Sequence, residues 1–566
     1  MPYRAPLNDF HFLLSVIAGF DSVVATPLFS DATSETVEAI LTEAARLCES
    51  GLAPLNRSGD AHPARLENGV VRTSPGFAEG YRAIAAGGWV GMSASPVFGG
   101  MGLPISVSTC VNEMMGSACL ALQLNPLMTQ GQIEALEHHA SDAIKALFIP
   151  KLVSGAWCGT MNLTEPQAGS DVGALRTKAE ANGDGSYAIS GQKIYITWAD
   201  NDFSDNVCHL VLARLPGGAG GTKGISLFIV PKFLPDAAGN SGARNALNVV
   251  SLEHKLGLHG SPTAVMQYDG ATGWLVGDAH DGMAAMFTMM NNARLGVAMQ
   301  GVAIAEAAFQ QALDYATTRR QGKTPLGSGA IIDHADVRRM LSQMKAEVFS
   351  ARAIGLSCAV AIDMARATGA ADWQARAAFL TPIAKAYGTD TGCEVAHMGV
   401  QVHGGMGVIE ATGAAQFCRD VRVTTIYEGT NGIQAMDLVG RKMMDQGEAA
   451  FRLIDEIQAM AEFARATNPE IAGDVWTAAE ALRETTEGLL LQPMADRFAG
   501  AVAYLRAFAL VLGGHFHLKA ASADSVRNPL AQFFIRRLLP AHSGLLAQVR
   551  QGSAGIYTLT PEALLA

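Results

Sequence analysis

The apolar residues of this chain change their spacing twice along the sequence. From Ser34 to about residue 153 they recur three and four positions apart, as Val37 and Leu41 do, which indicates amphipathic helices. Between residues 157 and 268 the apolar runs become short, β-rich and separated by Gly and Asp, which predicts strands. From residue 282 onward the helical spacing returns. This helix–strand–helix order lacks the βαβ alternation of doubly wound sheets that bind dinucleotides.

The order predicts an α+β protein, because 566 residues are too many for one core. We expect an N-terminal lead or strap, an N-terminal helical domain, a middle antiparallel β domain, a four-helix bundle domain and an added C-terminal helical domain. The β domain is predicted to be a small sandwich or barrel, and the lead a hairpin or strap. The expected bounds, in that order, are 1–35, 36–155, 156–281, 282–445 and 446–566.

Individual elements follow from the same spacing. The predicted strands are 157–164, 187–190, 194–198, 207–215, 224–231 and 263–268, and the predicted bundle helices are 284–319, 334–367, 373–401 and one after Glu428.

Composition narrows the function classes. Charged residues make up 16% and hydrophobic residues 49%, which indicates large buried interfaces. The net charge of −11 argues against nucleic acid or an anionic membrane as a main partner. The most apolar stretch, 284–308, carries Arg294 and Glu306, so we expect a core helix and no membrane span.

The cysteines and the N-terminal residues bear on location. The eight cysteines form no C-x-x-C pair, and no His cluster has zinc spacing, so no metal site is predicted and the thiols are expected to be free and buried. Residues 1–4 do not open a secretory signal. We therefore expect a cytoplasmic protein.

Three polar or glycine-rich segments interrupt the apolar pattern. Residues 403–407 (HGGMG) follow a helix and are either a helix cap or a close backbone approach to a ligand. Residues 162–171 (NLTEPQAGSD) end a strand and are either a surface turn or a polar binding loop. Residues 426–432 (IYEGTNG) place Glu428 in an apolar setting, where Thr430 or Asn431 could cap the next helix. A lone Glu is more often a solvated surface residue.

Together these segments resemble the acyl-CoA dehydrogenases. The resemblance rests on five motifs in the family's order: LTEPxAGSD at 163–171, KIYIT at 193–197, RRQG at 319–322, QxxGGxG at 401–407 and YEGT at 427–430. It implies a helical N-terminal domain, a middle β domain and a four-helix domain, the same division that the spacing predicts. It also implies an enzyme with FAD as its cofactor.

The resemblance implies a reaction at Glu428. Glu428 would remove the α proton of an acyl-CoA thioester while the β hydride passes to N5 of FAD. A carboxyl group in a dry pocket has a raised pKa, which suits this proton transfer. The backbone N–H of Glu428 and a ribityl hydroxyl of FAD would hold the thioester oxygen.

The resemblance also implies cofactor and substrate contacts. The FAD residues would be Met161, Leu163, Thr164, Gly169, Ser170, Tyr195 and Thr197 from the β domain, Arg319 and Gln321 from the neighbouring subunit, Gln401, Gly404 and Gly405 near the adenine, and Thr430. The substrate residues would be Ser170, Asn291, Arg294, Tyr427 and Gly429, although Arg294 could also be a helix arginine paired with an acid. The sequence departs from the family's pattern at Asn162, Asn291, Gly322 and Gly432.

The lead and the added C-terminal domain resemble the long subgroup of this family. That subgroup includes the 3-methylmercaptopropionyl-CoA dehydrogenases of dimethylsulfoniopropionate degradation, which implies conversion of that substrate to 3-methylthioacryloyl-CoA. A short-, medium- or broad-range fatty acyl-CoA dehydrogenase of beta-oxidation is the alternative. Some relatives are DNA-binding flavoproteins, but residues 446–566 hold ten basic and twelve acidic residues, too acidic for phosphate binding. The family implies a homodimer and an electron-transfer flavoprotein as electron acceptor.

Overall fold

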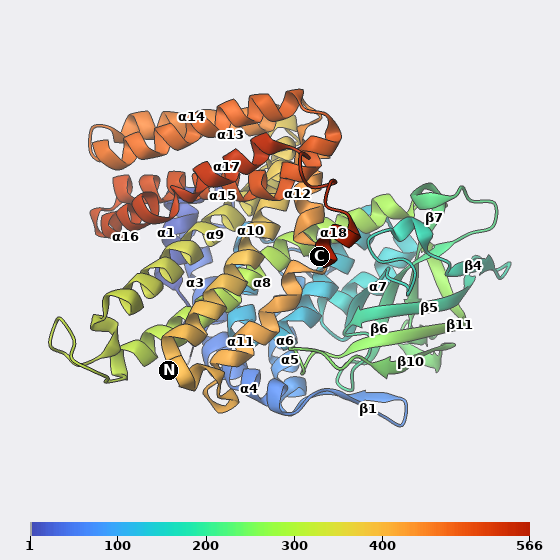
Figure 1. The fold of residues 1–566 in the computed structure, drawn as a ribbon. Helices are drawn as coiled ribbons and strands as arrows, with labels where there is room; N and C mark the ends of the chain where they lie inside the picture. Colours follow the sequence, from blue (N-terminus) through green and yellow to red (C-terminus); the bar gives the residue numbers. More distant parts are fainter. Residues whose placement is uncertain (1–2) are drawn as a thin grey trace.

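The computed structural model describes residues 3–566, so Met1 and Pro2 of the predicted lead lie outside the described residues. A β domain lies at the right of a set of long helices, and a second helical layer lies across the top of the bundle (Figure 1). The α+β prediction with a middle β domain and additional C-terminal helices is confirmed.

The N-terminal lead is a helical strap. It consists of α1 (Leu7–Phe12), a π-helical turn (Leu13–Ala18) and α2 (Asp21–Val24), and not of a hairpin. Phe10 and Leu13 are fully buried, because the strap packs against α9 and α15. The apolar run therefore belongs to the common core.

The N-terminal helical part follows the strap. Its elements are α3 (Ser34–Arg46), a π-helical turn (Leu47–Leu52), α4 (Ala53–Ala61), the hairpin β1 (Arg65–Glu67) and β2 (Val70–Arg72), α5 (Phe77–Ala86), α6 (Ile105–His139) and α7 (Asp142–Val153). The long helix α6 is broken at Cys119, whose backbone is extended (φ −158°, ψ 88°). The two halves of α6 therefore run in different directions along the core.

The middle domain contains a closed sheet. Its strands are β3 (Trp157–Asn162), β4 (Lys178–Ala181), β5 (Tyr187–Thr197), β6 (Asn206–Arg214), β7 (Ile225–Pro231), β10 (Leu247–Leu252) and β11 (Thr263–Val276), with a separate hairpin of β8 (Phe233–Pro235) and β9 (Ser241–Arg244). Pairing runs β11–β5–β4–β6–β7 and returns to β11, which closes a barrel, while β10 and β3 extend it.

This sheet differs from the sequence pattern in two respects. β3 and β4 pair parallel to β6, whereas only antiparallel pairing was predicted, because strand direction depends on the loops that join distant strands. The predicted strands 187–190 and 194–198 are one strand, since Gly191 does not end it but pairs with Tyr268. The short strands β4, β8, β9 and β10 were not predicted. β4 and β9 carry few apolar residues and β8 has only three residues, whereas β10 (LNVVSL) is apolar at four of its six positions and was missed.

The bundle is built from three long helices and two short ones. These are α8 (Gly282–Thr318), α9 (Ala335–Thr368), α10 (Ala371–His403), α11 (Ala414–Val421) and α12 (Asn431–Val439). α8 packs against α6, α9 and α10, so it lies at the centre of the molecule. The helix predicted after Glu428 is α12, which is only nine residues long.

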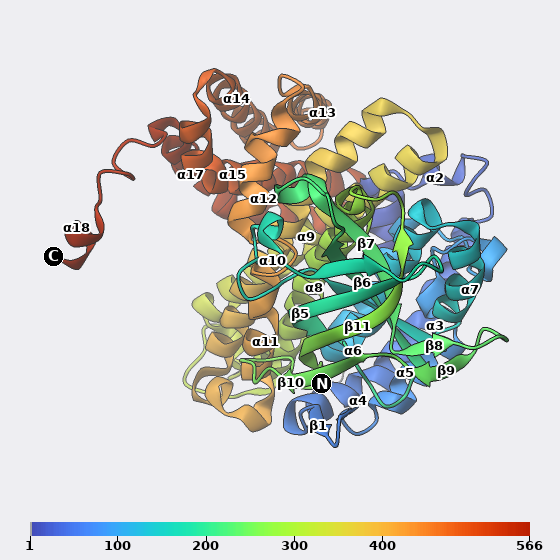
Figure 2. The same cartoon turned by 90° about the vertical axis from the view of Figure 1, so that its right-hand side faces the viewer.

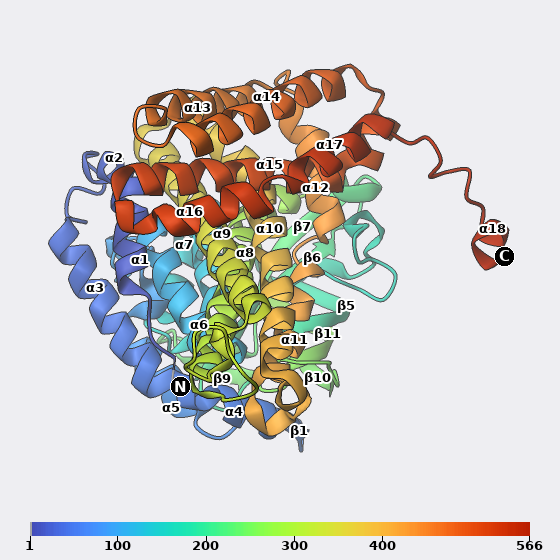
Figure 3. The ribbon, with the colours of Figure 1, turned by 60° about the vertical axis from the view of Figure 1, so that its left-hand side comes forward.

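The C-terminal helices form the outer layer. They are α13 (Glu448–Ala464), α14 (Pro469–Leu491), α15 (Met494–Ala523), α16 (Asn528–Phe533), α17 (Ala541–Gln551) and α18 (Pro561–Leu565). The buried helix α15 packs against α9, α10 and α12. The chain after α17 leaves the body and carries α18 away from it (Figures 2 and 3).

Three helices are long and apolar enough to cross a membrane by length and composition alone: Ile105–His139, Ala335–Thr368 and Met494–Ala523. The most apolar window of each is 89%, 89% and 78% buried inside the folded chain. Their apolar surface is therefore used in packing within the protein. The eight cysteines are all free; six are buried, while Cys393 and Cys418 are partly exposed.

Candidate active site

The segment around Glu428 is a strained turn between a short helical segment and α12. Glu428 has φ +56° and Gly429 has φ +86°, so two consecutive residues adopt left-handed backbone conformations. For a residue with a side chain this costs on the order of 1–3 kcal/mol. Gly is favoured at position 429 because of its left-handed φ, and a Cβ there would also lie 2.8 Å from Nε2 of Gln434. Such strain is retained where the surrounding structure holds it.

The residues that follow fix this turn from the α12 side. Thr430 is the N-cap of α12: its Oγ1 accepts from the backbone N–H of Ile433. Gln434 Nε2 donates to the carbonyl oxygen of Glu428 at 3.1 Å. The first turn of α12 therefore holds the backbone of Glu428, and the Thr430 hydroxyl proposed for FAD already has this helix-capping role.

Glu428 is partly buried between two cations. Burial raises the pKa of its carboxyl group to about 7, and the positive charges of Arg294 and Lys385 oppose that rise. Arg294 lies on α8, 7% exposed, and its Nη1 donates to Oδ1 of Asn291 at 3.2 Å. Within residues 3–566 its Nε is buried without a hydrogen-bond partner. Arg294, Asn291, Tyr427 and Gly429, all proposed for the substrate, are thus within one region around Glu428.

Lys385 was not predicted from the sequence. It is fully buried on α10, and its Nζ donates to the carbonyl oxygen of Gly429 and to Oδ1 of Asn431, both at 2.9 Å. A single lysine in the apolar helical run 377–388 is the signal that could have found it, because lysine is rarely fully buried without a function or a partner.

A row of hydrogen-bonded side-chain amides begins next to Tyr427. The hydroxyl of Tyr427 donates to Oε1 of Gln300, and Gln300 Nε2 donates to Oε1 of Gln123 at 3.5 Å. Gln123 Nε2 in turn donates to Oδ1 of Asn112 at 3.5 Å. The row connects the Glu428 segment with α8 and then with both halves of α6. Neither Gln300 nor Gln123 was predicted, because isolated glutamines in helices give no sequence signal.

The β-domain residues proposed for FAD lie at the ends of two strands. Met161 is in β3, Leu163 and Thr164 follow it, and Tyr195 and Thr197 end β5. Tyr195 has φ +60° and is 62% exposed. Beyond it, Trp198 Nε1 donates to the carbonyl oxygen of Ala121 on α6, close to Gln123 in sequence. The end of β5 and the Tyr427 amide row are therefore both attached to the same segment of α6.

A buried ion pair holds the loop after β3. Lys193 Nζ lies 2.8 Å from Oε1 of Glu165 and donates to the carbonyl oxygen of Leu163. Lys193 and hydrogen bonds from Thr177 and Arg176 lower the pKa of Glu165 to about 2, against the effect of burial. Gly169 and Ser170, further along the loop, are exposed.

Asn162, where the family usually has a small residue, points into the barrel. It is fully buried, and its side chain bonds to Thr160 and Tyr268. The unusual residue at this position therefore contributes hydrogen bonds inside the barrel.

The remaining predicted FAD residues lie at the far end of the bundle. Arg319 and Gln321 follow the C-terminus of α8; Gln401 is in the last turn of α10, which Gly404 and Gly405 follow. The ring of Tyr315 on α8 stacks on that of His403 on α10 at 4.4 Å, which brings both helix ends together. All five proposed residues are exposed. Along α8, Arg294 and Arg319 are about 37 Å apart at 1.5 Å per residue.

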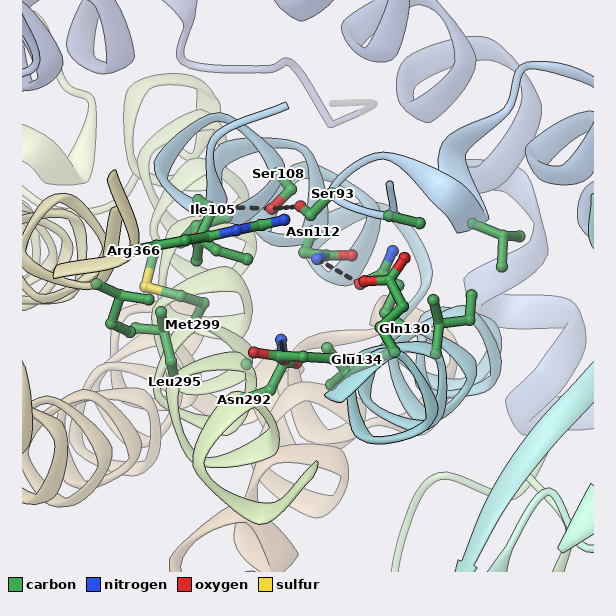
Figure 4. A pocket seen from close by; sticks show the side chains of 18 of the residues that line it. Ser93, Ile105, Ser108, Asn112, Gln130, Glu134, Asn292, Leu295, Met299 and Arg366 are labelled. Carbon is green, nitrogen blue, oxygen red and sulfur yellow. Dashed lines mark hydrogen bonds between the residues drawn. The ribbon is translucent and has the colours of Figure 1, made fainter. Parts of the chain in front are cut away.

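A cavity of about 210 Å³ lies between α6, α8 and α9 (Figure 4). Glu134 and Asn292 face one another across one side of it, with Asn292 Nδ2 donating to Glu134 at 2.7 Å. Asn112 and Gln130, also hydrogen-bonded, line the opposite side, and Arg366 reaches in from α9. Asn112 is also the last member of the amide row, so this row runs from Tyr427 to the wall of the cavity.

The site combines a β barrel, a helical bundle and one carboxylate on a strained turn. Comparison with known proteins identifies this arrangement as that of a flavin-dependent dehydrogenase of acyl thioesters. The acyl-CoA dehydrogenase N-terminal, middle and C-terminal domain profiles match residues 34–156, 160–271 and 280–444. An acetyl-CoA dehydrogenase C-terminal-like profile matches residues 453–560. The chain belongs to the acyl-CoA dehydrogenase family, and it is an FAD-dependent oxidoreductase that desaturates acyl-CoA thioesters.

Three relatives illustrate the similarity. The chain is 46% identical to a 3-methylmercaptopropionyl-CoA dehydrogenase of Ruegeria pomeroyi, over 81% of this chain and 79% of that protein. It is 34% identical to a broad-specificity linear acyl-CoA dehydrogenase of Mycobacterium tuberculosis, over 81% and 78%. Among solved structures, the Caenorhabditis elegans protein ACDH-11 in complex with C11-CoA superimposes with a TM-score of 0.80 over 95% of this chain and 92% of that one, at 19% identity. The last comparison concerns the fold alone.

Proposed function

We propose that this enzyme oxidises 3-methylmercaptopropionyl-CoA to 3-methylthioacryloyl-CoA, with Glu428 as the base that removes the α proton. The observation that carries the role of Glu428 is its position: a partly buried carboxyl group on a strained turn, with a pKa raised to about 7, between Arg294 and Lys385. A base with a pKa near the working pH is ionised often enough to accept a proton and basic enough to hold it.

The side chains around Glu428 fit a bound flavin and thioester. Arg294 Nε and Gln434 Oε1 are buried without partners within residues 3–566, and both belong to residues that interact with Glu428. Tyr195 presents an exposed aromatic ring at the end of β5, where an aromatic cofactor could pack against it. FAD, when bound, accepts the hydride that leaves the β carbon. We propose that residues 161–164, Tyr195 and Thr197 hold it from the β domain.

The chain's own groups then do three things. Glu428 Oε accepts the α proton, and the electron pair of the broken C–H bond becomes part of the new double bond. Arg294 stabilises negative charge beside Glu428, and its partner Asn291 orients the guanidinium. The hydrogen bond between Tyr427 and Gln300 fixes the aromatic ring that precedes Glu428, so the carboxylate is held in one place.

The amide row favours a substrate with a short, polar acyl group. An alkyl chain that extended past Tyr427 would have to displace the hydrogen bonds among Gln300, Gln123 and Asn112. Leaving a buried polar group unpaired costs about 1–3 kcal/mol. A thioether sulfur is a weak hydrogen-bond acceptor and tolerates such neighbours better than methylene groups do. The 46% identity with the Ruegeria pomeroyi enzyme supports the same substrate.

A linear fatty acyl-CoA is the second candidate. The cavity of about 210 Å³ beyond the amide row would accommodate additional methylene groups if these side chains moved. The 34% identity with the broad-specificity Mycobacterium tuberculosis enzyme favours this alternative.

We propose that the active unit is a homodimer. The residues proposed for FAD fall into two groups, one near the Glu428 turn and one at the Arg319 end of α8, and Arg319 lies about 37 Å along α8 from Arg294 beside Glu428. This separation supports an arrangement in which one FAD contacts the two groups from two different chains. An electron-transfer flavoprotein is the proposed acceptor of the electrons.

Two experiments test this proposal. Glu428→Gln keeps the shape of the side chain and removes the base. The variant should still bind flavin, but its rate of flavin reduction by substrate should fall by orders of magnitude. In the unmodified protein, anaerobic titration compares 3-methylmercaptopropionyl-CoA with butyryl-, octanoyl- and palmitoyl-CoA. A kcat/KM for the sulfur substrate at least equal to that for butyryl-CoA, with failure of palmitoyl-CoA, supports the first candidate. A clear preference for octanoyl- or palmitoyl-CoA supports the second.

A further inference from the structure

We propose that Lys385 is a positioning residue for the reaction: it holds the turn that carries Glu428 and keeps the Glu428 carboxyl group ionised. This inference rests on the proposed role of Glu428 as the base. Lys385 itself is on α10, behind the turn, and its hydrogen bonds run to the turn's backbone and to Asn431.

The geometry shows how Lys385 holds the turn. Its ammonium group binds the carbonyl oxygen of Gly429, directly after Glu428, and the side-chain oxygen of Asn431, the first residue of α12. These two acceptors lie on either side of Thr430. The left-handed backbone at Glu428 and Gly429 is unfavourable by itself, so a strong donor that binds Gly429 helps to maintain it.

Asn431 is held by the same turn of α10. Its Nδ2 donates to Oδ1 of Asp390 at 2.7 Å, to Oγ1 of Thr389 at 3.0 Å and to the carbonyl oxygen of Ala386 at 3.3 Å. One helical segment, residues 385–390, therefore fixes both ends of the link between Glu428 and α12.

The charge of Lys385 has no direct counter-ion in the described chain. None of the ion pairs among residues 3–566 includes Lys385, and its two hydrogen-bond acceptors are neutral oxygens. Burying an unpaired ammonium group is costly, and a methionine of similar length would fill the same space without that cost. The presence of the charge is explained if it acts on a carboxylate. Burial lowers the pKa of Lys385 to about 8, and the negative charge of Glu428 opposes that lowering more than that of any other group.

Other charged groups surround the pair. Arg294 on α8 acts on Glu428 in the same direction as Lys385, and Asp437 on α12 favours the charged form of Arg294. Asp390 on α10 favours the charged form of Lys385, and the pKa of Asp390 is influenced in turn by Glu394 on the same helix and by Arg506 on α15. Removing Lys385 leaves Arg294 as the remaining cation that acts on Glu428, so the carboxyl group should bind its proton more tightly.

The test measures the pH dependence of flavin reduction under single-turnover conditions in Lys385→Met and Lys385→Gln. Both variants remove the charge, and Gln retains a donor. An opposite charge nearby typically lowers a carboxyl pKa by 1–3 units. Without the Lys385 charge the pKa of Glu428 should rise, so the acidic limb of the pH–rate profile should shift to higher pH by about 1 unit or more in both variants. A purely structural role would reduce the rate equally at every pH, and an unmoved limb would overturn the proposal.

A second variant and a second readout keep the test independent of folding. Asp390→Asn removes a carboxylate that favours the charged form of Lys385, so the acidic limb should move to higher pH, by less than in the Lys385 variants; an unmoved or lowered limb contradicts the inference. Hydrogen–deuterium exchange of the peptide spanning residues 426–434 should be faster in Lys385→Met than in the unmodified protein, and unchanged exchange counts against the holding role.

The two proposals fail separately. If Glu428→Gln keeps normal flavin reduction, the assignment of the base is wrong. If Glu428→Gln is inactive while the Lys385 variants keep the original pH profile, only the role of Lys385 is wrong.

Discussion

The carboxylate of Asp9 lies 3.2 Å from the guanidinium of Arg527, although 518 residues separate the two in the sequence. Asp9 also lies 2.6 Å from Nζ of Lys345 on α9 and 3.8 Å from Arg352, whose guanidinium is paired with Glu113 and Glu306. One buried network of charges thus joins the N-terminal strap, α6, α8, α9 and the C-terminal layer.

Neutralising Asp9 should destabilise the assembled protein. Its three cationic neighbours lower the pKa of Asp9 from 3.8 to about 2, against the effect of burial. A pKa lowered in the folded state stabilises the protein above the unfolded-state pKa, and this contribution is lost as the pH falls from about 4 to about 2. Asp9→Asn should therefore cost about 2 kcal/mol at pH 7.

Urea unfolding of Asp9→Asn at pH 7, 5 and 3 measures this effect. The exposed carboxylate of Asp21, on the same strap, provides the matched control Asp21→Asn, for which little change is expected. A difference between Asp9→Asn and the unmodified protein that is as large at pH 3 as at pH 7 would contradict the electrostatic explanation.

The pH dependence of the reaction should reflect Glu428. Burial raises the pKa of this carboxyl group to about 7, and proton removal requires the ionised form. The single-turnover rate of flavin reduction should therefore increase as the pH rises through about 7 and level off above it. A rate that is constant between pH 6 and pH 8 would show that another group takes the proton.

Breaking the buried pair of Lys193 and Glu165 should loosen the loop that follows β3. Lys193→Met leaves the Glu165 carboxylate buried without its cation, which costs about 3–5 kcal/mol. Because Lys193 also binds the carbonyl oxygen of Leu163, retention of flavin should decrease together with the melting temperature. Flavin content after gel filtration and thermal unfolding measure both.

The exposed pair of Lys178 and Glu180 in the same domain is the control for this prediction. Lys178→Met should change stability much less, since solvent screens exposed pairs. Equal effects of the two substitutions would mean that burial of the Lys193 pair has no special importance.

Complementation tests whether two chains share each FAD. Arg319→Ala should weaken flavin binding, and Glu428→Gln should remove proton abstraction. When the two variants are unfolded and refolded together, mixed dimers would contain one site with both defects and one intact site, so activity should reappear. The unmodified chain carried through the same unfolding and refolding controls for refolding losses. Failure to recover activity would mean that Arg319 and Glu428 of one chain serve the same site.

Much of the fold could be predicted from the sequence because hydrophobic spacing has local causes. The helical period around Val37 and Leu41, the short β-rich runs and the return of helices after residue 282 gave the order of the parts. Strand direction was not predictable in this way: the parallel pairing of β3 with β6 depends on residues 163–205 returning the chain to the same edge.

The candidate site divides in the same manner. Glu428 stands in a motif whose neighbours in the sequence are its neighbours in space, so the sequence alone could indicate it. Lys385, Gln300 and Gln123 lie 43, 128 and 305 residues before Glu428 and belong to other helices. No local sequence pattern therefore connects them with Glu428. Their roles come from the packing of α10, α8 and α6 around one turn.

By itself, the sequence determined the period of each element, the family motifs and the glycine that a left-handed turn after Glu428 requires, since all of these depend on adjacent residues. The tertiary structure alone decided which cations face that carboxylate and which amides lie behind Tyr427. Those relationships follow from packing between distant segments, where burial and the electric field of neighbouring charges set the chemistry of a side chain.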